Sequence, residues 1–304
     1  METRKLYYED PFQKGFATTV VSCDEVKGGY AVVLAETAFY PEGGGQPYDT
    51  GVLGEANVLE VHEKNGVITH LCDKPFEVGK SVSGKIDWAR RFDHMQQHSG
   101  EHICSGLICE RFHCDNVGFH MGADVVTIDF NADISWDELM EIEQLANLYI
   151  YEDHPIDIQF YRGAELDKVE YRSKKPLEGD VRIISFPGAD CCACCGTHVV
   201  RSGQVGLVKF LSVQKFRDGV RIELLSGKRA HRYLSECWAQ DVRIAQALSV
   251  KPNASFAGVE RVLAELSALK QRCAKLEESV FAQTAAQYEG KGDVLLFEDE
   301  MSGD

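Results

Sequence analysis

The sequence predicts an α+β fold in three parts: a small N-terminal β-barrel, an α+β domain, and a C-terminal helical arm like a coiled coil. Three observations support this division. Residues 1–88 contain short runs of β-branched residues separated by glycine pairs and by Asp-, Asn- and Lys-rich joints, as a small barrel requires. Residues 89–235 mix helical periodicity with strand-like runs, and residues 236–304 are helical for most of their length.

The N-terminal part has a glycine-rich loop among its predicted strands. Clusters of β-branched residues predict strands at 18–22, 30–34, 58–62 and 67–71. The loop covers residues 41–47, and it contains three successive glycines, Gly43, Gly44 and Gly45, followed by Gln46. Such a backbone can approach another surface closely and expose its N–H groups.

The middle part combines two helices with several strands. One helix is predicted to begin between residues 87 and 92 and to run through Leu107. A second follows Ser135, the predicted N-cap, with Glu138 placed as in a capping box. Its buried stripe is predicted to contain Leu139, Ile142, Leu145, Ala146 and Ile150. Strands are predicted at 125–130, 156–160, 181–186, 204–210 and 220–225.

The chain after Gly227 is predicted to be mainly helical. Apolar residues alternate there at spacings of 3 and 4: Val259, Val262, Leu266, Leu269, Cys273, Leu276 and Val280. This heptad pattern predicts a homodimeric coiled coil through residues 259–280, the alternative being one helix packed on its own domain. A strand that stops just after it starts is predicted at 295–297, so we expect a truncated C-terminal domain and a longer parent form.

The charge distribution bears on nucleic-acid binding. The net charge is −16, from 48 acidic and 32 basic residues, which argues against indiscriminate binding to nucleic acid. A local basic strip, whose candidate contacts are Lys209, Lys215, Arg217 and Arg221, suits brief contact with a nucleic-acid end. The alternative is an ordinary solvated face.

The expected compartment decides how the 11 cysteines are interpreted. We expect a cytoplasmic protein, because no apolar run approaches the length of a membrane span and the first residues lack the features of a signal peptide. Most thiols would stay reduced there. Metal binding or plain burial is therefore a better explanation than a disulfide framework.

Four residues form a candidate zinc site. His98 and His102 have the i,i+4 spacing that places two imidazoles on one face of a helix. Cys194 and His198, in a CxxxH segment, would complete a tetrahedral set. His94 lies one more step back on the helix, where the azimuth drifts by about 40°, so we expect it to support a ligand or cap the helix.

The cysteine cluster leaves alternatives open. Cys191 with Cys194, and Cys192 with Cys195, form two overlapping CxxC pairs, so a thiolate-rich structural site is conceivable. Cys194 is the preferred ligand because it stands four residues before His198; mixed use of the other cysteines remains open. Zinc in such a shell could activate water, polarise a carbonyl or hold a substrate amine, and the sequence does not choose among these.

Three motifs, at residues 39–51, 94–102 and 194–199, resemble those of the alanyl-tRNA synthetase editing domain and, more closely, the free-standing AlaX trans-editing proteins. The likeness covers about residues 1–235. It implies Zn²⁺ on the four residues above and a glycine-rich loop, Gly43 to Gln46, that faces the catalytic site. It also implies hydrolysis of the ester that joins serine or glycine to alanine tRNA, with aminoacylated alanine tRNA as partner.

One position departs from the family pattern. Cys195 stands where the family usually has glycine, which disfavours a left-handed conformation and brings a sulfur near the zinc. Neither a Gly-x-Ser-x-Gly motif nor a Walker-type loop occurs, which disfavours serine hydrolases and NTPases. Two rival hypotheses are a non-catalytic zinc-containing tRNA-binding module and a thiol-rich redox or metal-buffering protein.

Overall fold

The computed structural model describes residues 2–173 and 179–295. It divides the chain into two compact units, residues 1–233 and 234–304. Every strand of the described ranges belongs to the first unit. The site described below lies entirely within that unit.

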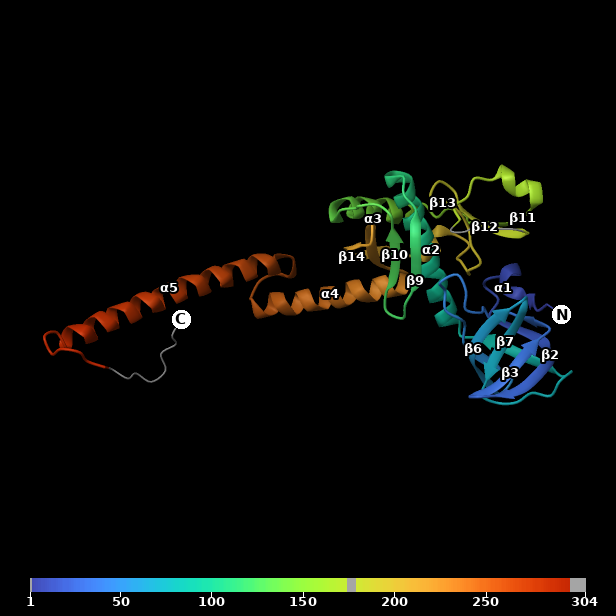
Figure 1. Ribbon diagram of the computed structural model, residues 1–304, viewed down its shortest axis with the longest axis horizontal. Helices are drawn as coiled ribbons and strands as arrows, with labels where there is room; N and C mark the ends of the chain where they lie inside the picture. The colour runs from blue at the N-terminus through green and yellow to red at the C-terminus, as the bar shows by residue number, and fades with distance from the viewer. Residues whose placement is uncertain (1, 174–178, 296–304) are drawn as a thin grey trace. The chain divides into compact units, whose positions relative to one another are not determined.

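The first unit begins with a closed six-stranded barrel (Figure 1). Its strands are β2 (Gly15–Val26), β3 (Gly29–Leu34), β5 (Gly51–Leu53), β6 (Ala56–Lys64), β7 (Val67–Cys72) and β8 (Ser81–Ile86). They pair antiparallel in the order β2-β3-β7-β6-β5-β8. The runs of β-branched residues predicted as strands lie within β2, β3, β6 and β7. Apolar side chains alternate inward, so that Val32, Leu53 and Val61 form part of a closed core.

A short N-terminal segment connects the barrel with the rest of the unit. Strand β1 (Arg4–Lys5) pairs in parallel with β4 (Glu36–Thr37), and helix α1 (Leu6–Glu9) follows β1 directly. Tyr7 of α1 is buried in the barrel core cluster.

The long helix α2 (Trp88–Phe112) extends from the barrel past a four-stranded sheet (Figure 1). Asp87 caps its N-terminus by accepting a hydrogen bond from the Arg90 N–H. The sheet has the order β14-β15-β10-β9, built from β9 (Asn116–Met121), β10 (Val126–Phe130), β14 (Val208–Phe216) and β15 (Gly219–Ser226). Helix and sheet approach closely at Gly100, where a Cβ atom would lie 2.1 Å from Ser226 Oγ.

Helix α3 (Trp136–Tyr151) packs against α2 and β14. Ser135 and Glu138 form the predicted capping box. Four of the five predicted stripe residues are buried, but Leu145 is 45% exposed, so its prediction was wrong. Leu145 keeps the helical spacing, but it lies outside the arc of α3 that reaches the core.

A three-stranded sheet, β11-β12-β13, completes the first unit. It consists of β11 (Asp157–Arg162), β12 (Asp180–Phe186) and β13 (Asp190–Ala193), with 3₁₀ turns η1 (Gly163–Lys168) and η2 (Ser202–Val205) along the chain.

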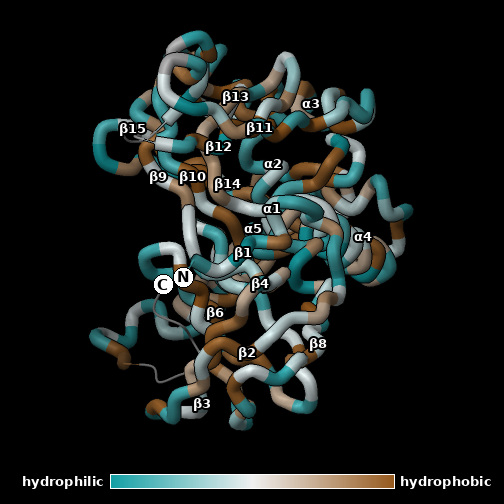
Figure 2. The backbone as a smooth tube through the Cα atoms, turned by 90° about the vertical axis from the view of Figure 1, so that its right-hand side faces the viewer, coloured by the Kyte–Doolittle hydropathy of each residue, from teal (hydrophilic) through white to brown (hydrophobic). Residues whose placement is uncertain are grey.

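The strand predicted at 204–210 is wrong in its first half. Residues 202–205 form η2, where Gly206 turns the chain with φ +86°, and the strand β14 begins only at Val208. Figure 2 shows hydrophobic residues concentrated in strands such as β2, β10 and β14, whereas the turns between them are hydrophilic.

Helix α4 (Gly227–Ala247) crosses the division between the units, and η3 (Pro252–Ala254) and α5 (Ser255–Gln287) follow it. The C-terminal helical prediction is thus confirmed. The residues of the predicted seam on α5 are exposed within the described chain; apart from Cys273, their exposed fractions run from 37% at Val259 to 58% at Leu276. Of the helices in the described ranges, none combines the length and apolar composition that a bilayer crossing requires. Two residues of the strand predicted at 295–297 lie outside those ranges.

Candidate metal centre

Four side chains that are far apart in the sequence come together beside α2. One donor atom from each of His98, His102, Cys194 and His198 lies within 4.8 Å of the others. Cys194 Sγ is 3.5 Å from His98 Nε2 and 3.7 Å from His198 Nε2. His102 Nε2 is buried and has no hydrogen-bond partner among the described residues. Three imidazoles and a thiol converging in this way could hold a transition-metal ion.

Local electrostatics favour the metal-binding forms of two of these groups, Cys194 and His198. Burial alone would raise the pKa of the Cys194 thiol, but the imidazoles of His98 and His198 lower this pKa well below its ordinary value. Burial lowers the pKa of His198 well below its ordinary value, so this imidazole is neutral. Thiolate sulfur and neutral imidazole nitrogen are the forms that coordinate metals.

Helix α2 and one loop fix the four ligands. His98 and His102 lie one turn apart, with their rings stacked at a centroid distance of 5.2 Å. The loop that carries Cys194 and His198 passes so close to α2 that a Cβ atom at Gly196 would lie 2.2 Å from His98 Cε1. Only glycine leaves room for this approach.

Arg182 fixes the backbone of the loop that carries Cys194 and His198. Arg182 Nη1 donates hydrogen bonds to the carbonyl oxygens of Cys194 at 2.7 Å and Gly196 at 3.0 Å. Its guanidinium lies over the Tyr8 ring, 4.8 Å from the centroid, and the Tyr8 hydroxyl donates to the Cys195 carbonyl oxygen at 3.0 Å. Helix α1 therefore helps to set the loop conformation.

Gln46 orients His98. Its Oε1 accepts a hydrogen bond from His98 Nδ1 at 2.9 Å and one from the Thr197 N–H at 3.1 Å. Its Nε2 donates to Thr197 Oγ1 at 2.8 Å. Because an amide oxygen only accepts, the His98 proton is on Nδ1 and its Nε2 lone pair faces the centre.

Asp190 has the same role for His102. Its Oδ2 accepts from His102 Nδ1 at 2.8 Å, and Arg172 donates to both of its oxygens at 2.7 and 2.8 Å. Burial alone would raise the pKa of Asp190, but its hydrogen bonds with His102 and Arg172 keep this pKa below its ordinary value. Asp190 and Arg172 were not identified from the sequence, where nothing marks an acid and an arginine so far from their histidine.

A pocket of about 600 Å³ opens beside the centre. Its walls include His98, His102, Cys194 and Gly44. Of the glycine-rich loop, Gly44 alone is among the described lining residues, and its φ of +59° suits glycine.

The other two glycines shape the loop behind the pocket. Gly43 and Gln46 exchange backbone hydrogen bonds at 3.0 and 3.1 Å, which closes a tight turn. A Cβ atom at Gly45 would lie 2.5 Å from the Phe119 ring. The structure therefore brings Gly44 to the pocket, whereas Gly43, Gly45 and Gln46 support it.

Two polar residues on the pocket wall were missed from the sequence. Glu101 Oε1 accepts hydrogen bonds from Ser105 Oγ at 2.6 Å and Asn116 Nδ2 at 2.8 Å. Asn116 Oδ1 is buried and has no hydrogen-bond partner among the described residues. Glu101 directly precedes a predicted ligand, His102, and this position could have identified it; Asn116 gave no such signal.

Two other cysteines, Cys192 and Cys195, line the same pocket as Cys194. Cys195 does not adopt a positive φ, so the expected backbone conflict does not arise. Its Sγ lies 3.8 Å from the Tyr40 hydroxyl, and its atoms are not in the ligand cluster. Cys192 forms a second possible ligand group with His102 and Asp190, which keeps mixed ligation open.

The basic strip lies on the β14–β15 hairpin, and its charges are largely paired. The amine of Lys209 is 2.8 Å from Glu143, that of Lys215 is 2.5 Å from Asp133, and the guanidinium of Arg221 is 2.7 Å from Asp129. Arg217 lies at the turn, 5.0 Å from the centroid of the Phe216 ring. None of these basic residues is among the described residues that line the metal-centre pocket.

Two family models match parts of the chain. The model for class II (A) tRNA synthetases matches residues 9–90. The model for the second additional domain of threonyl- and alanyl-tRNA synthetases matches residues 181–223. The first match covers all six barrel strands, and the second covers β12 from its second residue, β13 and the loop that carries Cys194 and His198.

Individual relatives match nearly the whole chain. The alanyl-tRNA editing protein AlaX-L of Pyrococcus horikoshii is 31% identical over 97% of this chain and 74% of its own length. The alanyl-tRNA editing protein Aarsd1-A of Xenopus laevis is 30% identical over 93% and 73%. The alanine–tRNA ligase of Pyrococcus abyssi is 35% identical over 97% of this chain, which spans about a third (34%) of that ligase.

Proposed function

Because the chain belongs to the family of alanyl-tRNA editing proteins, we propose that it hydrolyses the aminoacyl ester of mischarged alanine tRNA in trans. The amino acids removed are serine, glycine or both, and the setting is the cytoplasm. The observation that carries this proposal is the convergence of four ligand atoms on the wall of a pocket that also contains Gly44 and Glu101. A pocket of about 600 Å³ is within the size range of small-ligand sites.

Zinc is the ion that suits the donor set. With bonds of about 2.0–2.3 Å, ligand atoms around tetrahedral zinc lie about 3.3–3.8 Å apart. The separations of 3.5 and 3.7 Å from Cys194 Sγ to His98 and His198 agree with this spacing. When bound, zinc supplies a Lewis acid for the ester carbonyl or for a water molecule.

The residues of the chain bind and orient the substrate. The aminoacyl group has a positively charged ammonium, and the Glu101 carboxylate on the pocket wall is the acidic group that can accept its hydrogen bond. Ser105 and Asn116 fix this carboxylate through hydrogen bonds to one oxygen. Gln46 and Asp190 hold two imidazoles in place, so the ligands do not have to reorganise during the reaction.

Asn116 on the pocket wall can discriminate between the seryl and alanyl esters. Asn116 lines the pocket, and its buried Oδ1 lacks a partner among the described residues. A serine hydroxyl could donate to this oxygen, whereas the methyl group of alanine would leave it unpaired. Leaving a buried acceptor unpaired costs about 1–3 kcal/mol, which disfavours the correctly charged tRNA.

The test is deacylation of Ser-, Gly- and Ala-charged alanine tRNA by the wild type and by His102→Ala, with metal analysis of both proteins. We expect loss of the serine or glycine ester, retention of the alanine ester, and neither turnover nor stoichiometric zinc in the variant. A wild type that holds one zinc but deacylates none of the three tRNAs would overturn the proposal and favour a tRNA-binding module.

A further inference from the structure

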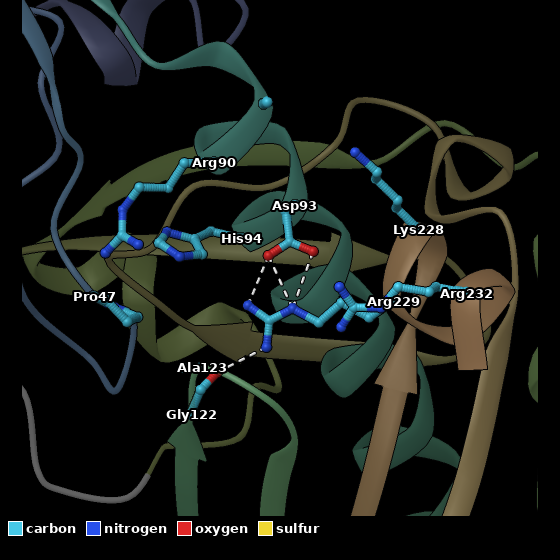
Figure 3. Close-up of a pocket in the computed structure, with 10 residues that line it drawn as sticks. Pro47, Arg90, Asp93, His94, Gly122, Ala123, Lys228, Arg229 and Arg232 are labelled. Carbon is cyan, nitrogen blue, oxygen red and sulfur yellow. Dashed lines mark hydrogen bonds and ion pairs between the residues drawn. The ribbon is translucent and has the colours of Figure 1, made fainter. Parts of the chain in front are cut away.

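A second pocket, of about 420 Å³, gathers cationic side chains outside the metal-centre pocket (Figure 3). Arg90 reaches it from α2, and Lys228, Arg229 and Arg232 reach it from the start of α4. Among the described residues that line this pocket, Asp93 is the acidic one. Four cations against one acid leave a net charge of +3 in a chain whose overall charge is −16.

The arginine nearest the acid is fixed. Arg229 donates from Nε and Nη2 to Asp93 Oδ2 at 2.9 and 2.6 Å, and from Nη1 to the Gly122 carbonyl oxygen at 2.7 Å. Arg90 Nε donates to the Tyr48 carbonyl oxygen at 3.0 Å. These bonds hold two guanidinium groups at the pocket wall before any ligand arrives, which lowers the entropic cost of binding one.

His94 supplies an independent sign of a missing partner. It is 3% exposed, it lines this pocket, and its Nδ1 is buried without a hydrogen-bond partner among the described residues. Figure 3 shows its ring between Arg90 and Asp93. Burial and the nearby charges of Arg90 and Arg229 lower its pKa to about 3, so the ring itself adds no cation. A buried polar atom without a partner is costly, and a bound ligand would satisfy it.

The position of this pocket links it to the metal centre. His94 stands on α2 one turn before His98, a rise of about 6 Å. Pro47 of the pocket directly follows Gln46, which holds His98. Gly122 directly follows β9, the strand that carries Phe119 of the metal-centre pocket. The same three segments therefore contribute to the walls of both pockets.

We propose that this basic pocket binds a backbone phosphate of the tRNA acceptor strand, close to the terminal ribose whose ester lies at the metal centre. The proposal rests on the editing function proposed above. A phosphodiester offers oxygens to arginine forks, to the Lys228 ammonium and to an imidazole N–H. Such a contact fixes the register of the strand and is independent of its base sequence.

The experiment uses the full chain with zinc and a set of uncharged alanine-tRNA minihelices. In each minihelix one of the last three internucleotide phosphates is replaced by a neutral methylphosphonate. Dissociation constants are measured for the wild type, for Lys228→Gln and for Lys80→Gln. Lys80 is a matched control because it is exposed on the barrel, near Glu77, and does not line the pocket. Inorganic phosphate is titrated separately as a free-anion probe, and deacylation of Ser-charged tRNA is followed in parallel.

We expect one methylphosphonate position to weaken binding to the wild type and to Lys80→Gln about tenfold, and to have little effect on Lys228→Gln, whose binding is already weakened. Equal effects of every replacement on all three proteins would overturn the phosphate site while leaving deacylation, and so the editing function, intact. A second outcome would also overturn the phosphate site: inorganic phosphate binds in a Lys228-dependent way, but no methylphosphonate replacement weakens minihelix binding. The pocket would then be a site for a free anion. A wild type that neither binds minihelices nor deacylates tRNA would overturn both proposals.

Discussion

Gln46 of the barrel loop accepts a hydrogen bond from His98 Nδ1 of α2 at 2.9 Å. A glycine-rich turn of the barrel thereby determines which nitrogen of a candidate metal ligand on α2 is free. The turn is stiff because Gly43 and Gln46 exchange backbone hydrogen bonds. The family motif around this glutamine thus has a structural role that can be tested separately from catalysis.

Replacing Gln46 with alanine is expected to lower zinc affinity by about 10- to 100-fold, because His98 loses the group that fixes its tautomer and orientation. The measurement is competition with a chromophoric chelator at fixed pH. Gln13→Ala is the matched control, since the Gln13 side chain donates to the Gly15 carbonyl oxygen on the barrel and does not contact the metal centre. An affinity equal to that of the wild type would show that Gln46 does not support the metal.

Replacing Asn116 with alanine is expected to reduce kcat/KM for Ser-charged tRNA more than for Gly-charged tRNA, by about 10-fold or more. Glycine has no hydroxyl to pair with Asn116 Oδ1. The decrease in kcat/KM for Gly-charged tRNA therefore reports only the displacement of the Glu101 carboxylate, which Asn116 helps to hold. Asn57→Ala, which alters a contact with Asp73 on the barrel, is the control. Equal losses for both substrates would assign Asn116 to positioning alone.

The stability of the barrel is expected to depend on His70. Its Nδ1 donates to the Val32 carbonyl oxygen at 3.1 Å and its Nε2 accepts from the Thr37 hydroxyl at 2.9 Å, which suits the neutral ring. Burial lowers the pKa of His70 from 6.5 to about 4. Above pH 6.5 the ring is neutral in both states. As the pH falls from 6.5 to 4, the unfolded chain binds a proton that the folded chain does not, so the free energy of unfolding decreases.

The decrease in the free energy of unfolding that is due to His70 is about 3 kcal/mol and is complete below about pH 4. It is measured as the difference between wild type and His70→Gln in urea unfolding at a series of pH values, which cancels groups common to both. The exposed residue His62, replaced by glutamine, serves as the control. Parallel pH profiles for wild type and His70→Gln would contradict the assignment.

Much of the candidate metal centre could be predicted from the sequence because the spacing of its residues is local. The i,i+4 spacing of His98 and His102 needs only a helix, and the CxxxH segment needs only a turn. The residues that support them could not be predicted, because Asp190 stands 88 positions from His102 in the chain and becomes its neighbour only through the fold.

The errors in the fold have physical causes of the same kind. Leu145 has the spacing of a buried residue, but whether it contacts the core depends on the packing of α3 against its neighbours. The residues 204–207 were included in a strand, although Gly206 at φ +86° ends a 3₁₀ turn there. Spacing along a helix locates the buried face but not how far that face extends, and a single glycine does not reveal its own φ.

The basic strip of the β14–β15 hairpin remains a predicted tRNA contact. The double variant Lys215→Glu/Arg217→Glu is expected to weaken tRNA binding and reduce its salt dependence without changing zinc content. Loss of the exposed Lys215–Asp133 pair itself costs under about 1 kcal/mol, so the fold should persist. Unchanged binding and salt slope would leave the basic pocket beside His94 as the better candidate for contact with the acceptor strand.

The most direct test of the account is zinc titration of the metal-free protein, with deacylation of Ser-charged alanine tRNA as the readout. The account predicts that activity rises from zero and reaches its plateau at one zinc per chain, and that His102→Ala stays inactive throughout. Full deacylation by the metal-free protein, or a plateau that His102→Ala also reaches, would contradict a catalytic metal centre on these four residues.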